Sequence, residues 1–211
     1  MPAHSFIVIE GNIGAGKTSL ATMYARHIGS RLILEEFAEN TFLPKFYENP
    51  ERYAFPVELS FLSERFSQLK KELLARDLFT PAVVADYFIS KCQIFARNNL
   101  VPDEYELFLK MYEMVESSIP KPDLLVYLYL PVEQLQMNIR KRGRPYEQQI
   151  TDRYLEDIQR QYIEFIRQHE DLRVLIVDTA DVDFVGDRRH TERMFDLLRG
   201  EWPVGISRVK A

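Results

Sequence analysis

The sequence has one cysteine, Cys92, among its 211 residues, and its four histidines form no Cys/His cluster at the spacing of zinc ligands. A single thiol cannot form an internal disulfide, and a chain of this length can bury a sizeable core without cross-links or metals. These absences exclude a disulfide-stapled or zinc-stabilised small domain. They also suit a reducing compartment such as the cytoplasm.

Long apolar runs are missing as well. The longest, residues 124–132, has about half of the ~20 residues needed to cross a bilayer, and it therefore predicts a buried strand. Residues 1–10 lack the basic region, long apolar core and cleavage site of a secretory signal. We therefore expect a cytoplasmic protein with no membrane partner.

Positive charge is not in excess, because 27 Lys and Arg face 32 Asp and Glu and give a formal net charge of −5. The chain thus lacks the broad positive field that duplex DNA binding needs, and we expect no nucleic-acid partner. With 46% hydrophobic and 28% charged residues, the composition is that of a globular domain. The absence of repeats and linkers predicts a single domain over residues 1–211.

Two kinds of hydrophobic pattern alternate along the chain. Near-continuous apolar runs, typical of buried strands, cover residues 5–10, 31–35, 82–87, 123–130 and 172–178. Helical spacing covers residues 17–28, 50–75, 90–118, 132–142 and 152–169. This alternation predicts an α/β fold of three layers, with a five-stranded parallel sheet flanked by helices. We expect the tail after Gly200 to be irregular.

One segment matches the phosphate-binding pattern G-x-x-x-x-G-K-[ST] without a mismatch, and it lies between a predicted strand and a predicted helix. In such a P-loop, backbone N–H groups surround phosphate oxygens, the lysine reaches the β and γ phosphates, and the hydroxyl can bind Mg²⁺. We expect ATP and Mg²⁺ to bind here. The residues are Gly11, Asn12, Ile13, Gly14, Ala15, Gly16, Lys17 and Thr18.

Two further features bear on chemistry. The second predicted strand ends in Glu35 and Glu36, at the sheet edge where ligands bind in open α/β folds, and a carboxylate there can accept a proton from an attacking hydroxyl. Farther along, four positive charges occupy five positions around Gly143, which can end a helix. We interpret residues 140–150 as an arginine-rich lid.

From Glu35 onward, the chain resembles the deoxynucleoside kinases, particularly the bacterial deoxyadenosine/deoxyguanosine kinases. The resemblance covers most of the chain and rests on five ordered blocks: the P-loop, EEFAEN at 35–40, FYxxPxxYAF at 46–55, FLxxR at 61–65 and RGRxxEQ at 142–148. It implies a P-loop kinase fold, a homodimer, and ATP-dependent transfer of the γ-phosphoryl group to the 5′-hydroxyl of a deoxynucleoside in nucleoside salvage.

The resemblance also implies roles for single residues. Glu35 matches the general base that takes the proton of the 5′-hydroxyl. Tyr47 and Glu147 match the pair that hydrogen-bonds the sugar 3′-hydroxyl. Phe95 matches the aromatic ring that stacks on the base, and Arg65 the arginine that reads the edge of the base. The lid arginines that neutralise charge on the transferred phosphoryl group are matched by Arg140, Arg142 and Arg144.

Three positions depart from the family pattern. Glu58 stands where most relatives carry a glutamine that pairs with the base, and Lys91 stands where many have an acid. At residues 84–87 the Glu-Arg pair of many relatives is missing. Asp86, which lies in this segment, is expected either to bind Mg²⁺ through water or to assist Glu35.

Glu58 bears on the substrate. An ionised carboxylate only accepts hydrogen bonds, so it repels the carbonyls of thymine and accepts from the amino group of adenine, guanine or cytosine. Thymidine is therefore the least favoured acceptor, and this chemistry does not separate the two purines. The bacterial resemblance favours deoxyadenosine first and deoxyguanosine second.

Two other functions fit a P-loop. A nucleoside monophosphate kinase, such as thymidylate kinase, also has an arginine lid, but its phosphorylated acceptor calls for extra positive charge where this chain has Glu35, Glu36 and Glu58. A nucleotide-dependent switch would use an acid such as Asp86 at the end of a strand.

The long apolar helices at 50–75 and 90–118 exceed what one face of a sheet needs as cover. We therefore expect a homodimer that forms across them.

Overall fold

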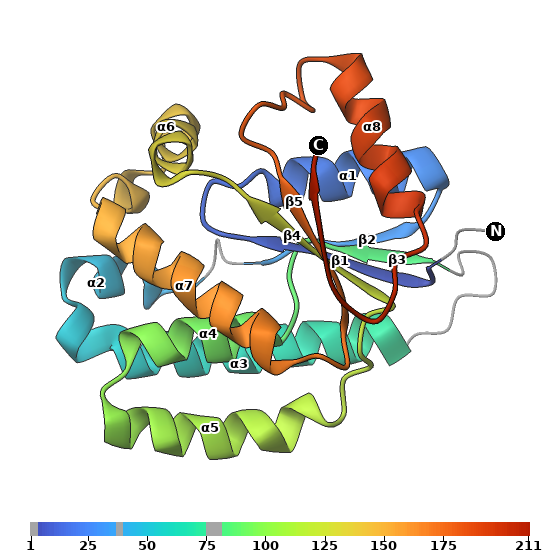
Figure 1. Ribbon diagram of the computed structural model, residues 1–211. Helices are drawn as coiled ribbons and strands as arrows, with labels where there is room; N and C mark the ends of the chain where they lie inside the picture. Colours follow the sequence, from blue (N-terminus) through green and yellow to red (C-terminus); the bar gives the residue numbers. More distant parts are fainter. Residues whose placement is uncertain (1–3, 37–39, 75–81) are drawn as a thin grey trace.

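The computed structural model describes residues 4–36, 40–74 and 82–211 (Figure 1). In these ranges, six parallel strands form one sheet in the order β2-β3-β1-β4-β5-β6. The strands are β1 (Phe6–Gly11), β2 (Arg31–Ile33), β3 (Val83–Ala85), β4 (Leu124–Tyr129), β5 (Arg173–Asp178) and β6 (Gly205–Lys210). A parallel sheet needs crossover connections, and helices supply them.

Helices cover both faces of the sheet, which confirms the predicted three-layer α/β fold. Figure 1 shows α1 and α8 on one side and α3, α4 and α7 on the other, with α5 outermost. The helices are α1 (Lys17–Ile28), α2 (Leu43–Glu48), α3 (Pro50–Leu74), α4 (Ser90–Asn99), α5 (Pro102–Glu116), α6 (Val132–Arg142), α7 (Asp152–Gln168) and α8 (Arg188–Arg199), with a short 3-10 helix, η1 (Pro145–Glu147).

Each face of the sheet has its own hydrophobic core. Along β1, Val8 packs into the core under α3, α4 and α7, whereas Ile7 and Ile9 pack into the core under α1 and α8. Successive side chains of a strand point to opposite faces, so a strand buried on both faces is apolar at every position. This explains why the strands appear in the sequence as continuous apolar runs.

The strand count and the tail differ from the prediction. The tail after Gly200, expected to be irregular, contains β6, which pairs with β5 along its whole length and makes the sheet six-stranded. Only one face of β6 is sheltered: Ile206, Arg208 and Lys210 are exposed, and the residues between them are half-buried. Such an edge strand lacks the continuous apolar run by which the other strands were predicted.

The helix predicted over residues 90–118 is two helices. α4 ends at Asn99, and α5 begins at Pro102 after an extended Leu100. Proline has no N–H to continue a helix, and it favours an extended conformation in the residue before it. The helix predicted over 50–75 is α3, and its predicted last residue, Ala75, lies outside the described ranges. A helix able to span a membrane is absent from residues 4–36, 40–74 and 82–211.

The strand order determines what meets at the ligand-binding edge. In a parallel sheet all strands end at the same edge, and here β2, β3 and β1 are neighbours. The chain leaving β1 is the P-loop, the chain leaving β2 carries Glu35, and Asp86 directly follows β3. Three segments that are far apart in the sequence therefore converge on one place.

Candidate active site

The P-loop closes tightly at the start of α1. Gly14 and Gly16 both have φ of 86°, a conformation that side chains disfavour. A Cβ atom at Gly14 would lie 2.8 Å from the carbonyl oxygen of Leu135, and one at Gly16 would lie 2.9 Å from Cζ of Phe184. The glycines are thus required by backbone conformation and by close packing, as a loop that wraps phosphate groups needs.

Two polar side chains fix the loop. Asn12 is buried, and its Nδ2 donates to the carbonyl oxygen of Leu155 at 2.8 Å, while its Oδ1 accepts from the N–H of Ile13 at 2.8 Å. Lys17 folds back so that its Nζ donates to the carbonyl oxygen of Asn12 at 2.8 Å. The lysine is therefore held at the loop, where it can reach a bound phosphate.

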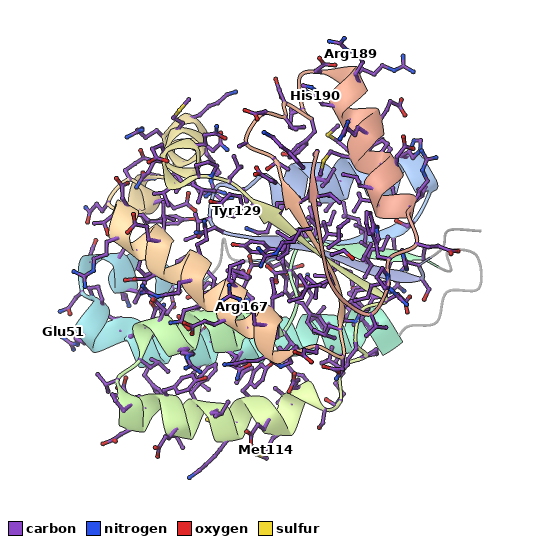
Figure 2. The ribbon with its side chains drawn as sticks, viewed as in Figure 1. Glu51, Met114, Tyr129, Arg167, Arg189 and His190 are labelled. Carbon is purple, nitrogen blue, oxygen red and sulfur yellow. The ribbon has the colours of Figure 1, made fainter. Side chains whose placement is uncertain are left out.

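A cleft extends from the P-loop between α6 and the segment that precedes α8; we call it the donor cavity. Gly14 to Ser19 form its floor, and Arg142 and Arg144 lie at one side. No motif in the sequence marks the rest of the lining, which comes from α6 and from the segment before α8 with the first turn of that helix. It includes Met137, Asn138, Asp181, Asp183, Phe184 and His190. His190, labelled in Figure 2, lies in the first turn of α8.

A second cavity, the acceptor cavity, meets the donor cavity at Lys17, Thr18, Arg142 and Arg144, which line both. The structure brings all eight predicted substrate residues to its walls: Glu35, Tyr47, Glu58, Arg65, Asp86, Lys91, Phe95 and Glu147. Asn99 and Tyr154 also line it and were missed by the sequence analysis. Arg140 lies on the exposed side of α6 and lines neither cavity.

Glu35 lies between two cations in the acceptor cavity, and its side chain is 10% exposed. Its Oε1 accepts from Nε and Nη2 of Arg65 at 2.8 and 2.5 Å, and its Oε2 accepts from Nζ of Lys91 at 2.5 Å. Burial by itself would raise the pKa of Glu35, but the charges of Lys91 and Arg65 hold this pKa well below its ordinary value. Glu35 is therefore ionised and able to accept a proton.

The two cations have further features. Arg65, which was expected to read the edge of the base, lines the acceptor cavity, and its guanidinium contacts Glu35 and lies 3.2 Å from Sγ of Cys92. Lys91, which departs from the family pattern, also pairs with Glu35. Positive charge beside Glu35 is thus supplied although residues 84–87 lack the arginine of many relatives.

Asp86 connects the P-loop to the segment after β2 that carries Glu35. Its Oδ2 accepts from Oγ1 of Thr18 at 2.5 Å, and its Oδ1 accepts from the N–H of Glu35 at 2.7 Å. Within the part of the chain that the structure describes, no three His, Cys, Asp or Glu side chains gather as a protein-only metal site would require. This fits Mg²⁺, which commonly takes one or two protein ligands and completes its shell with phosphates and water.

The lid is tied to the acceptor cavity through Glu147. α6 ends at Arg142, and Gly143 follows with φ of 71°, as predicted for a glycine that stops a helix. Glu147 is buried, and its carboxylate accepts from Arg142 at 3.0 and 2.5 Å and from Arg144 at 3.1 Å. Both arginines therefore lie beside the acceptor cavity as well as the donor cavity.

Known proteins similar to this chain share one family description. A family model described as "Deoxynucleoside kinase" matches residues 7–200. A deoxyguanosine kinase from Bacillus subtilis (strain 168) is 39% identical over 90% of this chain and 93% of its own length. A deoxyadenosine/deoxycytidine kinase from the same organism is 28% identical over 94% of this chain and 93% of its own length.

The fold is also found among solved structures. Deoxyadenosine kinase from M. mycoides with bound dCTP aligns with a TM-score of 0.78 at 24% identity, covering 92% of this chain and 98% of that one. At this identity the match shows the fold alone. The family model spans most of the sequence, and the 39% identical relative is matched over nearly its full length. The chain therefore belongs to the deoxynucleoside kinase family.

Proposed function

We propose that the protein transfers the γ-phosphoryl group of Mg·ATP to the 5′-hydroxyl of a purine deoxynucleoside, as a step of nucleoside salvage. The observation that carries this proposal is that two cavities meet at Lys17, Thr18, Arg142 and Arg144, with the ionised Glu35 in one of them. A phosphoryl group at this junction would have cations around it and a hydrogen-bond acceptor on the side of the incoming hydroxyl.

The residues present fit Mg·ATP. The loop from Gly11 to Thr18 would hold the phosphates, and Thr18 and Asp86, whose side chains are already hydrogen-bonded, would bind Mg²⁺ directly or through water. Bound there, the metal would neutralise charge on the phosphates. Lys17, Arg142 and Arg144 would stabilise the charge that spreads over the transferred group.

The acceptor would lie with its base between Phe95 and Glu58 and with its sugar at Tyr47 and Glu147. Glu58 disfavours thymine because a carboxylate oxygen repels a carbonyl. Between the purines, deoxyadenosine was expected first, but we propose deoxyguanosine first because the relative with 39% identity is named a deoxyguanosine kinase.

A substrate panel tests the proposed function. With Mg·ATP at about pH 8, where Glu58 is ionised, we expect kcat/KM for deoxyguanosine to exceed that for deoxyadenosine, and kcat/KM for deoxyguanosine to exceed that for thymidine by at least about tenfold, the effect of one poorly paired buried polar group. Thymidine as the fastest acceptor would contradict the purine assignment. Faster turnover of nucleoside monophosphates would indicate a monophosphate kinase, and ATP consumption that ignores every acceptor would indicate a switch.

The Glu147→Gln variant tests the connection between the lid and the nucleoside. An amide cannot neutralise Arg142 and Arg144 together, so both the sugar site and the lid should lose their order. We expect KM for the nucleoside to rise and kcat to fall by about tenfold each, the cost of weakening charged hydrogen bonds. Glu133→Gln, an exposed position on the same lid helix, is the matched control. A change confined to KM for ATP would contradict this role.

A homodimer is also proposed. The long apolar helices that led us to expect a homodimer are α3, α4 and α5 in the structure. On α5, the side chains of Leu107 and Met114 are 52% and 78% exposed. Met114 points away from the body of the molecule in Figure 2. Sedimentation velocity on the purified chain would distinguish a dimer from a monomer.

A further inference from the structure

Glu58 combines burial with an incomplete set of hydrogen bonds. It is 2% exposed on α3 and lines the acceptor cavity. Its Oε1 accepts from Nδ2 of Asn99 at 2.7 Å, whereas its buried Oε2 has no hydrogen-bond partner among the described residues. Burying a polar oxygen without a partner is costly, so such an atom on a cavity wall indicates that a ligand completes its hydrogen bonds.

The neighbours of Glu58 indicate which part of the ligand reaches it. Glu58, Phe61 and Arg65 follow one another at helical spacing on the face of α3 that lines the acceptor cavity. The Cζ atom of Arg65 lies 4.4 Å from the centre of the Phe61 ring, and Nζ of Lys91 lies 5.5 Å from the centre of the Phe95 ring. Both cations are engaged with Glu35, so Glu58 is left to meet the edge of a base held against these rings.

We propose that Glu58 selects between guanine and adenine by its own protonation state. This rests on the proposed function and deepens it. The ionised carboxylate accepts hydrogen bonds from N1–H and from the amino group of guanine. The protonated carboxyl donates its O–H to N1 of adenine and accepts from the N6 amino group. The ionised form mismatches adenine, because N1 of adenine is itself an acceptor, and the protonated form loses one of the two acceptors that N1–H and the amino group of guanine need.

The surroundings of Glu58 allow both forms near neutral pH. Burial is the largest effect on Glu58 and raises its pKa to about 7. The hydrogen bond from Asn99 and the charges of Arg65 and Lys91 act in the opposite direction and lower this pKa, but by less. The charged and titratable groups that face it are Arg65 on its own helix, Lys91 and Cys92 on α4, Tyr47 on α2 and Tyr154 on α7. Burial raises the pKa values of this thiol and of both phenols, which are therefore neutral at pH 7.

The direction of the effect follows. Below about pH 7 Glu58 is protonated and favours deoxyadenosine, and above this pH it is ionised and favours deoxyguanosine. A group whose titration affects both substrates equally does not change the ratio of the two kcat/KM values. Where each form accepts only one base, this ratio changes about tenfold per pH unit, so we expect it to rise by at least about tenfold in favour of deoxyguanosine between about pH 6 and about pH 8.

Two variants test the inference against the wild-type protein. Glu58→Gln carries an amide that does not titrate and that can both donate to and accept from either purine, so the ratio of the two kcat/KM values should be independent of pH. Asn99→Ala removes a hydrogen bond that stabilises the ionised form, so the pH at which the wild-type preference changes should move upward.

The outcomes are distinguishable. A wild-type ratio that stays constant across this pH range would overturn the inference, and so would a Glu58→Gln variant that keeps the wild-type slope. Both results would leave the proposed function standing, because the purines would still be phosphorylated. Failure to phosphorylate either purine at any pH would overturn the proposed function itself, and this inference with it.

Discussion

Replacing Glu35 with glutamine should lower kcat by about a thousandfold, within the usual range for the loss of a general base. Glutamine keeps the shape of the side chain but cannot take a proton from the incoming hydroxyl. The carboxylate of Glu35 lies in the acceptor cavity, in the wall that adjoins Lys17 and Thr18. KM for the nucleoside should change much less than kcat, because the residues proposed to hold the sugar and the base are unchanged in this variant. Steady-state kinetics with varied nucleoside separates the two effects.

The neighbouring acid provides a matched control. Glu36 is exposed and does not line either cavity, so Glu36→Gln should retain kcat within about threefold, as expected of a surface substitution. A similar loss in both variants, or more than about a tenth of wild-type kcat in Glu35→Gln, would contradict the assignment of the base.

Glu35→Gln should also be less stable, because it leaves Arg65 and Lys91 buried without their counter-charge. Breaking a buried ion pair from one side typically costs about 3–5 kcal/mol. The kinetics therefore need a temperature well below the melting temperature of the variant. The paired cations have a second effect: by stabilising the carboxylate they weaken it as a base.

The Lys17→Met variant should have the other large effect, a fall in kcat of about a thousandfold. Methionine keeps the length of the side chain and removes the charge. Lys17 lines both cavities, and its Nζ is already held at the P-loop by Asn12. The lost charge acts on the phosphates, so calorimetry should find nucleoside affinity within about threefold of the wild type, as expected for a substitution that leaves the nucleoside contacts intact.

Lys121→Met is a suitable control for Lys17→Met. Lys121 forms an exposed ion pair with Asp171 at 2.5 Å, and exposed pairs of this kind contribute little to stability. Its kcat should therefore equal that of the wild type. A loss of less than about tenfold in Lys17→Met would show that this lysine does not act on the transferred phosphoryl group.

The central strands and the P-loop could be predicted from the sequence because their constraints are local. A strand buried on both faces must be apolar at consecutive positions, and the loop after β1 must have glycine wherever its backbone turns or packs closely. By contrast, β6 has a half-exposed edge pattern, and α8 is short and rich in charge. Asp187, which caps α8 by accepting from the N–H of Arg189, was a local signal that the sequence analysis did not use.

The residues of the acceptor cavity could be named from the family blocks, but their pairings could not. Glu35, Arg65 and Lys91 come from three different segments, and their contacts depend on how α3 and α4 pack beside the sheet. Asn99 and Tyr154 belong to none of these blocks, so no pattern in the sequence singled them out. One part of the second block, residues 37–39, lies outside the described ranges.

The parallel direction of β6 affects where the chain can be extended in the laboratory. β6 ends at Lys210, so the carboxyl terminus emerges at the same edge of the sheet as the two cavities, whereas β1 begins at Phe6 on the opposite edge. Nζ of Lys210 lies 2.7 Å from Asp181, a residue of the donor cavity wall. An affinity tag or fluorescent protein fused after Ala211 would therefore start beside the nucleotide entrance. The same fusion placed ahead of β1 would lie at the far side of the molecule.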